Sequence, residues 1–305
     1  MKLSNKNPIT IEPLQPYDFS LLLQDLQQYP LDVTERVVGD KLLRGFWAKG
    51  GVPVQSIIKA QGNALAVDIY AANDVTPSII ETKITHILNL DLDLNQWYKT
   101  IPKEDPMLKI ITAFRGAKPT AKPTVFESMV TAILEQQLNV TFACTLETRL
   151  IKKYGMKLVT DAGTSWIFPT PKRIAQLDYD ALRPMQISGS KSRYIIDIAR
   201  HIVDEEIDPE AWTSLDDDEL MKQLMAIRGI GRWSAEYIML IGYRRFDHAP
   251  AADIGLRNAV TKLTGSAEQL SEKATREYMD RFAGYRGLAT AYIWSAFSAG
   301  ILDKY

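Results

Sequence analysis

The segment best suited to bind a ligand is a glycine turn within Leu224-Met225-Ala226-Ile227-Arg228-Gly229-Ile230-Gly231-Arg232-Trp233-Ser234-Ala235. The pattern predicts a helix that ends at Ile227 and a second helix that begins near Arg232. Two glycines allow backbone dihedrals closed to other residues, and Ile230 between them anchors the turn to a core. Exposed N–H groups at the second helix start then form an anion site, which suits a phosphate and reads no base. A plain helical hairpin also explains a Gly-x-Gly turn.

Three further side chains carry candidate chemistry. Asp253 precedes an apolar-periodic run, so its spacing alone predicts a helix N-cap whose carboxylate accepts the first amides. Trp233 and Tyr237 are four residues apart at the start of one helix and therefore share a face. The sequence alone leaves open whether this face is core or a binding surface. His248 is interpreted as a surface or packing histidine.

The composition is typical of a folded globular protein. The 305 residues are 46% hydrophobic and 24% charged, which excludes a disordered, collagen-like or membrane protein. No segment approaches eighteen consecutive apolar residues, and residues 1–8 contain no apolar signal core, so we expect no membrane partner. The single Cys144 forms neither an internal disulfide nor a thiolate metal site, which indicates a reducing, intracellular setting.

Local charge is more informative than the net charge of −1. Residues 204–219 contain nine acids and no Lys or Arg, whereas residues 220–262 contain seven bases and three acids, a local net charge of +4. A basic stretch on a near-neutral protein is able to dock a polyanion. Scattered solvated charge is the plainer explanation.

The elements that must position these residues fall into two regions. Residues 1–108 predict an α+β unit with an antiparallel sheet: alternation in 54–58 and 64–70 around a turn at 61–63 predicts a hairpin, and 76–90 a helix. From residue 109 the pattern predicts helices only, the first capped by Thr124 and Glu127 as a capping box and reaching Gln137. Further helices are expected over 141–154, 190–203 and 214–227.

Several segments resemble the helix-hairpin-helix DNA glycosylases, most closely the 3-methyladenine DNA glycosylase II branch. The motifs lie at 132–140, 168–171, 224–235, 250–257 and 285–294, and the N-terminal unit is also similar, so the resemblance covers nearly the whole chain. It implies a mainly α protein: an N-terminal α+β domain at 1–108, then a two-lobed helical region at 109–305. The helix-hairpin-helix would occupy 215–243, with a cleft between the lobes.

The resemblance also implies roles for single residues. Asp253 would face the glycosidic bond of a nucleotide extruded from the duplex, where a carboxylate stabilises the cation-like sugar or orients water. No second acid is evident near it in the sequence. The implied base pocket is Trp233, Tyr237 and Tyr285; the implied DNA wedge is Gln137, with Leu138 beside it; and the implied phosphate-binding hairpin is Arg228, Gly229, Ile230, Gly231, Arg232 and Ser234.

The reaction type follows from one position of the hairpin. Lyases of the family resemble Gly-Val/Ile-Gly-x-Lys, where the Lys amine is the nucleophile. Trp233 occupies that position here, which predicts a monofunctional glycosylase that uses water and leaves an abasic site. Electron-rich rings attract a positively charged alkylated purine by about 0.5–2 kcal/mol per contact, so 3-methyladenine and 7-methylguanine are the expected bases. Such a base leaves without a general acid.

The remaining expectations concern partners and cofactors. We expect a monomer that binds double-stranded DNA with a damaged base, in the cytoplasm or nucleoid of a bacterium or the nucleus of a eukaryote. One cysteine excludes the iron–sulfur cluster of the endonuclease III branch. No cofactor or metal is expected, although the family permits an alkali-metal ion at the hairpin carbonyls of residues 227–230.

Two alternatives remain open on the sequence. A non-catalytic helix-hairpin-helix DNA-binding protein would keep the hairpin and tolerate the loss of Asp253. A glycosylase for deaminated or oxidised bases would need hydrogen-bond donors in its pocket. Departures from the family pattern bear on the substrate: Arg228 replaces a usual Pro, Glu135 a small residue, and Phe282 and Tyr285 two Trp residues. Arg286 either contacts DNA or pairs with an acid.

Overall fold

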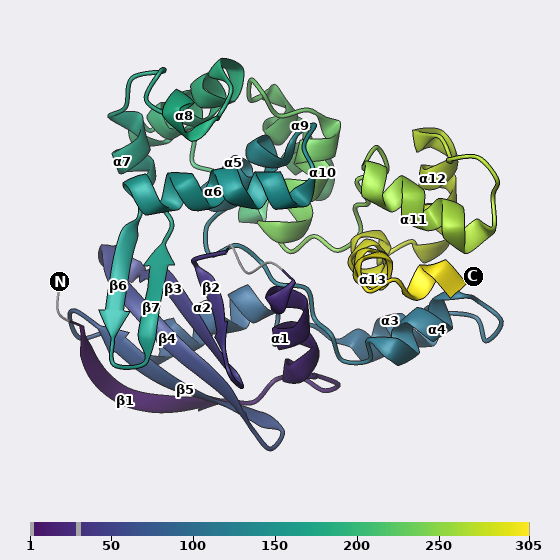
Figure 1. Cartoon of the computed structure of the whole chain (residues 1–305), viewed down its shortest axis with the longest axis horizontal. Helices are drawn as coiled ribbons and strands as arrows, with labels where there is room; N and C mark the ends of the chain where they lie inside the picture. Colours follow the sequence, from purple (N-terminus) through teal and green to yellow (C-terminus); the bar gives the residue numbers. More distant parts are fainter. Residues whose placement is uncertain (1–2, 29–31, 305) are drawn as a thin grey trace.

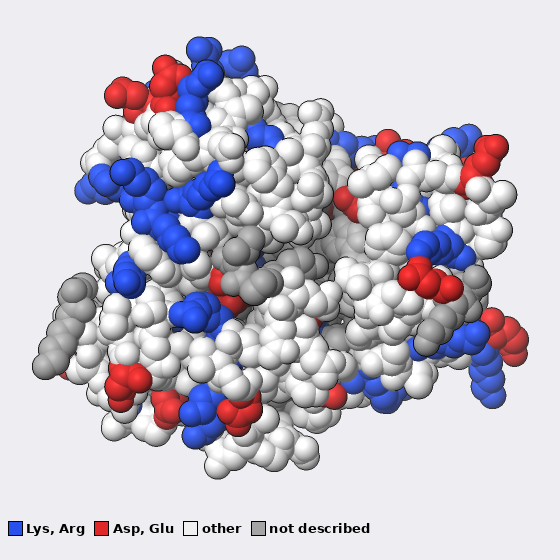
Figure 2. Space-filling model, in the orientation of Figure 1, with Lys and Arg blue, Asp and Glu red and all other residues white. Residues whose placement is uncertain are grey.

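The computed structural model of the chain describes residues 3–28 and 32–304. An N-terminal sheet, a first helical lobe and a second helical lobe lie around a common centre (Figure 1). Each of the three has its own hydrophobic core. Figure 2, drawn in the orientation of Figure 1, shows that the surface is hollowed between the two helical lobes. None of the helices in the described ranges is long and apolar enough to cross a membrane.

The N-terminal sheet has five antiparallel strands in the order β1-β5-β4-β3-β2. They are β1 (Ser4–Ile11), β2 (Glu35–Val38), β3 (Lys41–Ala48), β4 (Val52–Gln61) and β5 (Ala64–Ala71). The predicted hairpin is confirmed, because β4 and β5 pair Gln61 with Ala64 across a turn in which Gly62 has φ +62°. Helices α1 (Phe19–Gln27) and α2 (Pro77–Leu88) bury Leu22, Ile80 and Ile84 in the core of this sheet.

The prediction that only helices follow residue 109 is wrong at one place. Strands β6 (Met156–Thr160) and β7 (Gly163–Ile167) form a two-stranded sheet, and β7 packs against β3. Gly45 of β3 permits this close approach, since a Cβ atom there would lie 2.5 Å from the Trp166 carbonyl oxygen. An isolated two-stranded hairpin is only marginally stable, so β6 and β7 depend on the sheet beneath them rather than on their own pattern.

The first helical lobe is built around α5, which is buried along most of its length. Its helices are α5 (Val125–Glu135), α6 (Val140–Tyr154), α7 (Pro171–Ala175), α8 (Gly189–Val203), α9 (Asp217–Ala226) and α10 (Arg232–Ile241). Thr124 caps α5 by accepting the Glu127 amide at 3.1 Å. The predicted capping box is only half formed, because the Glu127 carboxylate turns instead to Arg44 Nη2, 3.5 Å away.

The second helical lobe contains α11 (Ile254–Thr264), α12 (Glu272–Met279) and α13 (Arg286–Ser298). Helices α3 (Leu94–Thr100) and α4 (Met107–Ala113) pack with it: the rings of Trp97 and Tyr292 lie 4.6 Å apart, and the hydroxyls of Tyr98 and Tyr292 are 2.6 Å apart. The packing therefore differs from the predicted division at residue 108. Residues 94–111 join a core that the C-terminal part of the chain completes, a contact between distant segments that local patterning does not reveal.

Candidate active site

The glycine turn connects α9 to α10 as the sequence predicts, but its two glycines act differently. Gly229 has φ +95°, and a Cβ atom there would lie 2.4 Å from the ring of Tyr194. Gly231 has φ −92°, which any residue adopts, and nothing lies within 4 Å of a Cβ built on it. Only Gly229 is therefore required by the turn itself, whereas Gly231 leaves open space at the start of α10.

The open space lies beside the first amides of α10. Gly231 is the N-cap of α10 and provides no side-chain hydrogen bond to the first turn, so these N–H groups remain available to an anion. Ile230 is buried and anchors the turn, as predicted. Ser234 differs from its prediction as a phosphate ligand: it is buried, and its hydroxyl accepts Gln136 Nε2 at 2.9 Å.

The basic stretch at 220–262 is largely committed to contacts within the protein. Arg232 pairs with Glu236, Arg244 with Asp91, Arg245 with Asp217 and Lys262 with Asp303. The Arg228 guanidinium lies over the Tyr194 ring, 5.8 Å from its centroid. These four side chains are ion-paired rather than simply solvated, and the anion site depends chiefly on the backbone amides.

We predict opposite outcomes for alanine at the two glycines. Gly229→Ala should destabilise the protein by about 1–2 kcal/mol from its positive φ alone, plus the clash with Tyr194. Gly231→Ala should melt within about 2 °C of wild type, yet weaken duplex binding because its methyl group occupies the open space. Thermal melting and fluorescence anisotropy with a labelled duplex measure the two effects. Unchanged duplex affinity in Gly231→Ala would contradict the anion site.

The turn between α5 and α6 presents one side chain outward. Gln137 is exposed and has φ +57°, a left-handed conformation that is uncommon for residues other than glycine. Leu138 is partly buried and packs against the core of the first lobe. Of the two wedge candidates, Gln137 is the one placed to project from the surface.

Two side chains that the sequence reasoning missed hold this turn in place. Gln136 Nε2 donates to the Gly229 carbonyl at 2.8 Å and to Ser234 Oγ at 2.9 Å, which ties the turn to the hairpin. Lys191 Nζ donates to the carbonyls of Leu134 and Gln136 at 2.8 and 2.7 Å. The polar pair Gln136-Gln137 was visible in the sequence, but their different directions were not.

Asp253 is both a helix cap and a candidate catalyst. Its Oδ1 accepts the Leu256 amide at 2.7 Å and Trp294 Nε1 at 3.1 Å. Its Oδ2 accepts no hydrogen bond from residues 3–28 or 32–304, and the side chain is half-buried. The cap interpretation is confirmed, and the cap fixes the carboxylate while leaving one oxygen for a substrate.

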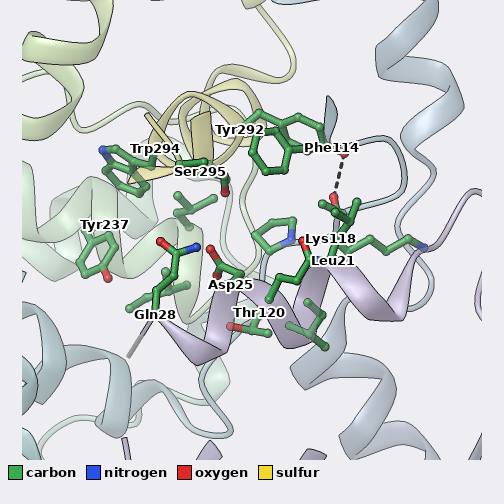
Figure 3. A pocket seen from close by; sticks show the side chains of 18 residues that line it. Leu21, Asp25, Gln28, Phe114, Lys118, Thr120, Tyr237, Tyr292, Trp294 and Ser295 are labelled. Atoms are coloured by element: carbon green, nitrogen blue, oxygen red, sulfur yellow. Dashed lines mark hydrogen bonds between the residues drawn. The ribbon is translucent and has the colours of Figure 1, made fainter. Parts of the chain in front are cut away.

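An aromatic cluster lies next to Asp253. Trp233 and Tyr237 stack with centroids 5.5 Å apart, and Trp294 meets Tyr237 edge-on at 6.0 Å. Tyr237 and Trp294 also line a cavity of about 280 Å³ beside α1. In Figure 3, Asp25 of α1 and Gln28, the C-cap residue of that helix, point toward Trp294 from the opposite wall.

Tyr285 is not part of this cluster. It is the N-cap residue of α13 and packs against the core of the second lobe. Trp294 lies nine residues further along the same helix, about 13 Å along its axis. The third ring of the cluster is therefore Trp294, which stood in the same sequence segment and was overlooked.

Comparison with known proteins fits this geometry. The profile of the HhH-GPD superfamily of base excision DNA repair proteins matches residues 130–283. The chain belongs to this superfamily. A Bacillus subtilis protein named DNA-3-methyladenine glycosylase is 30% identical over 207 residues, which cover 68% of this chain and 68% of that protein.

Solved structures show the fold. A 3-methyladenine DNA glycosylase from Archaeoglobus fulgidus matches with a TM-score of 0.84 at 20% identity, covering 97% of this chain and 99% of that one. A Clostridium acetobutylicum 8-oxoguanine glycosylase/lyase, in complex with double-stranded DNA, matches with a TM-score of 0.78 at 16% identity, covering 98% of each. The predicted helix-hairpin-helix glycosylase fold with an N-terminal antiparallel sheet is confirmed.

In this HhH-GPD chain an acid that the sequence-based reasoning did not place, Glu135, contacts the aromatic cluster. Tyr237 Oη donates to Glu135 Oε1 at 3.4 Å. Burial raises the pKa of Glu135 to about 7; the charges of Glu147 and Asp253 add to the rise, and Lys122 opposes it. Burial, followed by the nearby Glu135, also raises the pKa of Tyr237 well above its usual range.

The two remaining candidates have structural partners. Arg286 forms ion pairs with Asp247 at 2.7 Å and Asp280 at 2.9 Å, so of its two open roles the structure shows the pairing with acids. His248 Nε2 lies 2.8 Å from Asp217 Oδ2 and holds the loop before α11 against α9. It is a packing histidine, as the sequence indicates.

Proposed function

We propose that this protein is a monofunctional N-glycosylase that hydrolyses the bond between an alkylated purine and its deoxyribose in double-stranded DNA. The observation that carries the proposal is the Asp253 carboxylate. One oxygen is fixed by the Leu256 amide and the Trp294 indole, and the other is left without a protein donor among the described residues. Membership of the superfamily and the relatives named as 3-methyladenine glycosylases support the choice of substrate.

Each part of the site has a task in this reaction. The amides at Gly231 bind a DNA phosphate. Gln137 fills the gap that the extruded nucleotide leaves in the duplex. Extrusion costs a few kcal/mol of free energy, and this cost is smallest at a damaged base pair. The rings of Tyr237 and Trp294 bind a cationic alkylated base by stacking and cation–π attraction. The Asp253 charge stabilises the cation-like sugar while water attacks.

The absence of a lysine at position 233 and the contacts of Lys191 both favour water as the nucleophile. Trp233 stands where the lyases of the family carry their Lys, so no amine is supplied by the first turn of α10. Lys191, behind the α5–α6 turn, donates to two backbone carbonyls. The product is therefore an intact strand with an abasic site.

The same proposal includes a monomer, since the hairpin, Asp253 and the aromatic cluster all come from one chain. The protein would act inside the cell.

A monovalent cation also fits the hairpin, because two of its backbone carbonyl oxygens are able to coordinate such an ion. The Ile227 carbonyl accepts the Ile230 amide at 3.0 Å and the Gly229 carbonyl accepts Gln136 Nε2 at 2.8 Å. Each oxygen has a second lone pair for a cation.

Base release from globally methylated duplex DNA tests the reaction. We expect free 3-methyladenine and 7-methylguanine in the supernatant, and strands that break only after alkali treatment. Borohydride should trap no covalent complex, because no Schiff base forms. Strand cleavage without alkali, or a trapped complex, would contradict the hydrolytic mechanism; binding of DNA without any base release would favour the non-catalytic alternative.

A further inference from the structure

We propose that Asp25, on the N-terminal helix α1, is the residue that selects a cationic base over a neutral base of the same shape. The inference rests on the proposed glycosylase function and deepens it by assigning the choice of base to the N-terminal region. Aromatic rings stack on every base, because every base has a π-face, so the rings of the site need a second group to discriminate strongly.

Asp25 lines the same cavity as the two rings. The cavity of about 280 Å³ receives Tyr237 from α10, Trp294 from α13 and Asp25 from α1. In Figure 3 the Asp25 side chain points across this space toward Trp294. The Trp294 indole donates to Asp253 at 3.1 Å, so the cavity adjoins the carboxylate that is assigned to the sugar. A base that enters the cavity beside Asp253 therefore lies between the rings and Asp25.

The charge of Asp25 has no counter-charge within the cavity. Two charged side chains line the cavity, Asp25 and Lys118. Lys118 Nζ donates to the carbonyls of Leu14 and Leu90 at 2.8 and 2.9 Å, and in Figure 3 it extends away from Trp294. The Asp25 carboxylate forms no hydrogen bond or ion pair with residues 3–28 or 32–304. The wall opposite Trp294 thus presents an uncompensated negative charge to whatever occupies the space.

This arrangement is able both to attract a cation and to reject a neutral base. Burial, followed by the charge of Glu35, raises the pKa of Asp25 to about 6, so the carboxylate is mainly ionised at pH 7. A cationic alkylated purine supplies the missing positive charge, and its N–H groups donate charge-assisted hydrogen bonds. A neutral purine displaces water from the carboxylate without replacing the lost charge stabilisation, which costs free energy. Specificity then arises from attraction and rejection together.

The variant Asp25→Asn tests this role, because the amide keeps the shape of the side chain and removes its charge. Binding is measured at pH 7 with two duplexes, each carrying one nucleotide that resists cleavage. The first holds cationic 7-methylguanine on a 2′-fluorinated sugar, and the second holds its 7-deaza analogue, in which a neutral carbon replaces the charged ring nitrogen. We expect wild type to prefer the cationic duplex and Asp25→Asn to reduce this preference by about 10- to 100-fold, the range of a hydrogen bond to a charged group. The remaining preference comes from the two rings.

Thermal melting provides a second readout, which separates a binding role from a structural one. Because the charge of Asp25 is half-buried and unpaired, its removal should raise the melting temperature at pH 7 by about 2 °C or more. Affinity for the cationic duplex and stability should therefore change in opposite directions. Asp18→Asn makes the same charge change on α1, where Asp18 accepts the Ser20 amide at 2.9 Å. This control should bind both duplexes as wild type does.

The outcomes separate this inference from the proposed function. An unchanged preference in Asp25→Asn overturns the role of Asp25, and so does an equal loss of affinity for both duplexes, which would mean that Asp25 only shapes the cavity. A lower melting temperature together with such an equal loss would make it a structural residue. A wild-type protein that releases 7-methylguanine from methylated DNA and binds the two duplexes equally overturns the selection by charge and leaves the proposed function intact. Absence of any base release overturns the proposed function itself.

Discussion

Replacement of Asp253 by Asn should lower the rate of alkylated-base release by about 1000-fold and leave the protein folded. Asn caps helices as well as Asp does, so the Leu256 amide keeps its acceptor, and so does the Trp294 indole. What the variant loses is the negative charge beside the sugar. Removal of one electrostatic stabiliser of a transition state costs about 100- to 1000-fold, and here the stabiliser carries a full charge.

Single-turnover base release and anisotropy with a duplex carrying an uncleavable nucleotide measure the two halves of this prediction. Duplex affinity should remain within a few-fold of wild type, because the hairpin amides at Gly231 are unchanged. Asp18→Asn is the matched control: Asp18 caps α1 by accepting the Ser20 amide at 2.9 Å, and its loss of charge should not affect release. Retention of wild-type release in Asp253→Asn would remove Asp253 from the mechanism.

The features predicted correctly from the sequence are those fixed by local chemistry. The hairpin turn, the Asp253 cap and the β4–β5 turn each depend on residues within a few positions of one another. Strands β6 and β7 were missed because their support comes from β3, more than a hundred residues earlier. Residues 94–100, which form α3, were assigned to the N-terminal region for the same reason.

In the candidate site, too, the local features were predicted and the contacts between distant segments were not. The sequence motifs of the site were found, but the directions of the side chains within them were not. Tyr285 and Trp294 share a helix, and only the packing of α13 shows which ring reaches Tyr237. Glu135 looked like a departure from a family pattern. Its contact with Tyr237 arises because α5 packs against α10, and that packing is a property of the assembled lobe.

The N-terminal sheet contributes to the site by fixing α5, and Arg44 is the main link. Arg44 is 1% exposed, donates to Thr34 Oγ1, and lies between Glu35 at 3.4 Å and Glu127 of α5 at 3.5 Å. Arg44→Met should lower the free energy of unfolding at pH 8 by about 3–5 kcal/mol, because two buried carboxylates lose their counter-charge. Urea denaturation at fixed temperature measures this loss.

The deficit of Arg44→Met should shrink at pH 5. Burial raises the pKa of Glu35 and of Glu127, the latter to about 7, while Arg44 opposes both shifts. Without Arg44 these carboxyls bind protons more readily in the folded state than in the unfolded state. Stability then falls as the pH rises through that range and recovers as it drops.

Two comparisons isolate the cause of this loss. Arg36→Met changes an exposed arginine of β2 that donates to the Thr164 carbonyl at 2.7 Å, and it should cost less than about 1 kcal/mol. Adding Glu35→Gln and Glu127→Gln to Arg44→Met should restore much of the stability at pH 8, because the uncompensated charges disappear. If Arg44→Met unfolds at the wild-type urea concentration, the buried ion group does not hold α5 to the sheet, and the apolar contacts between sheet and lobe suffice.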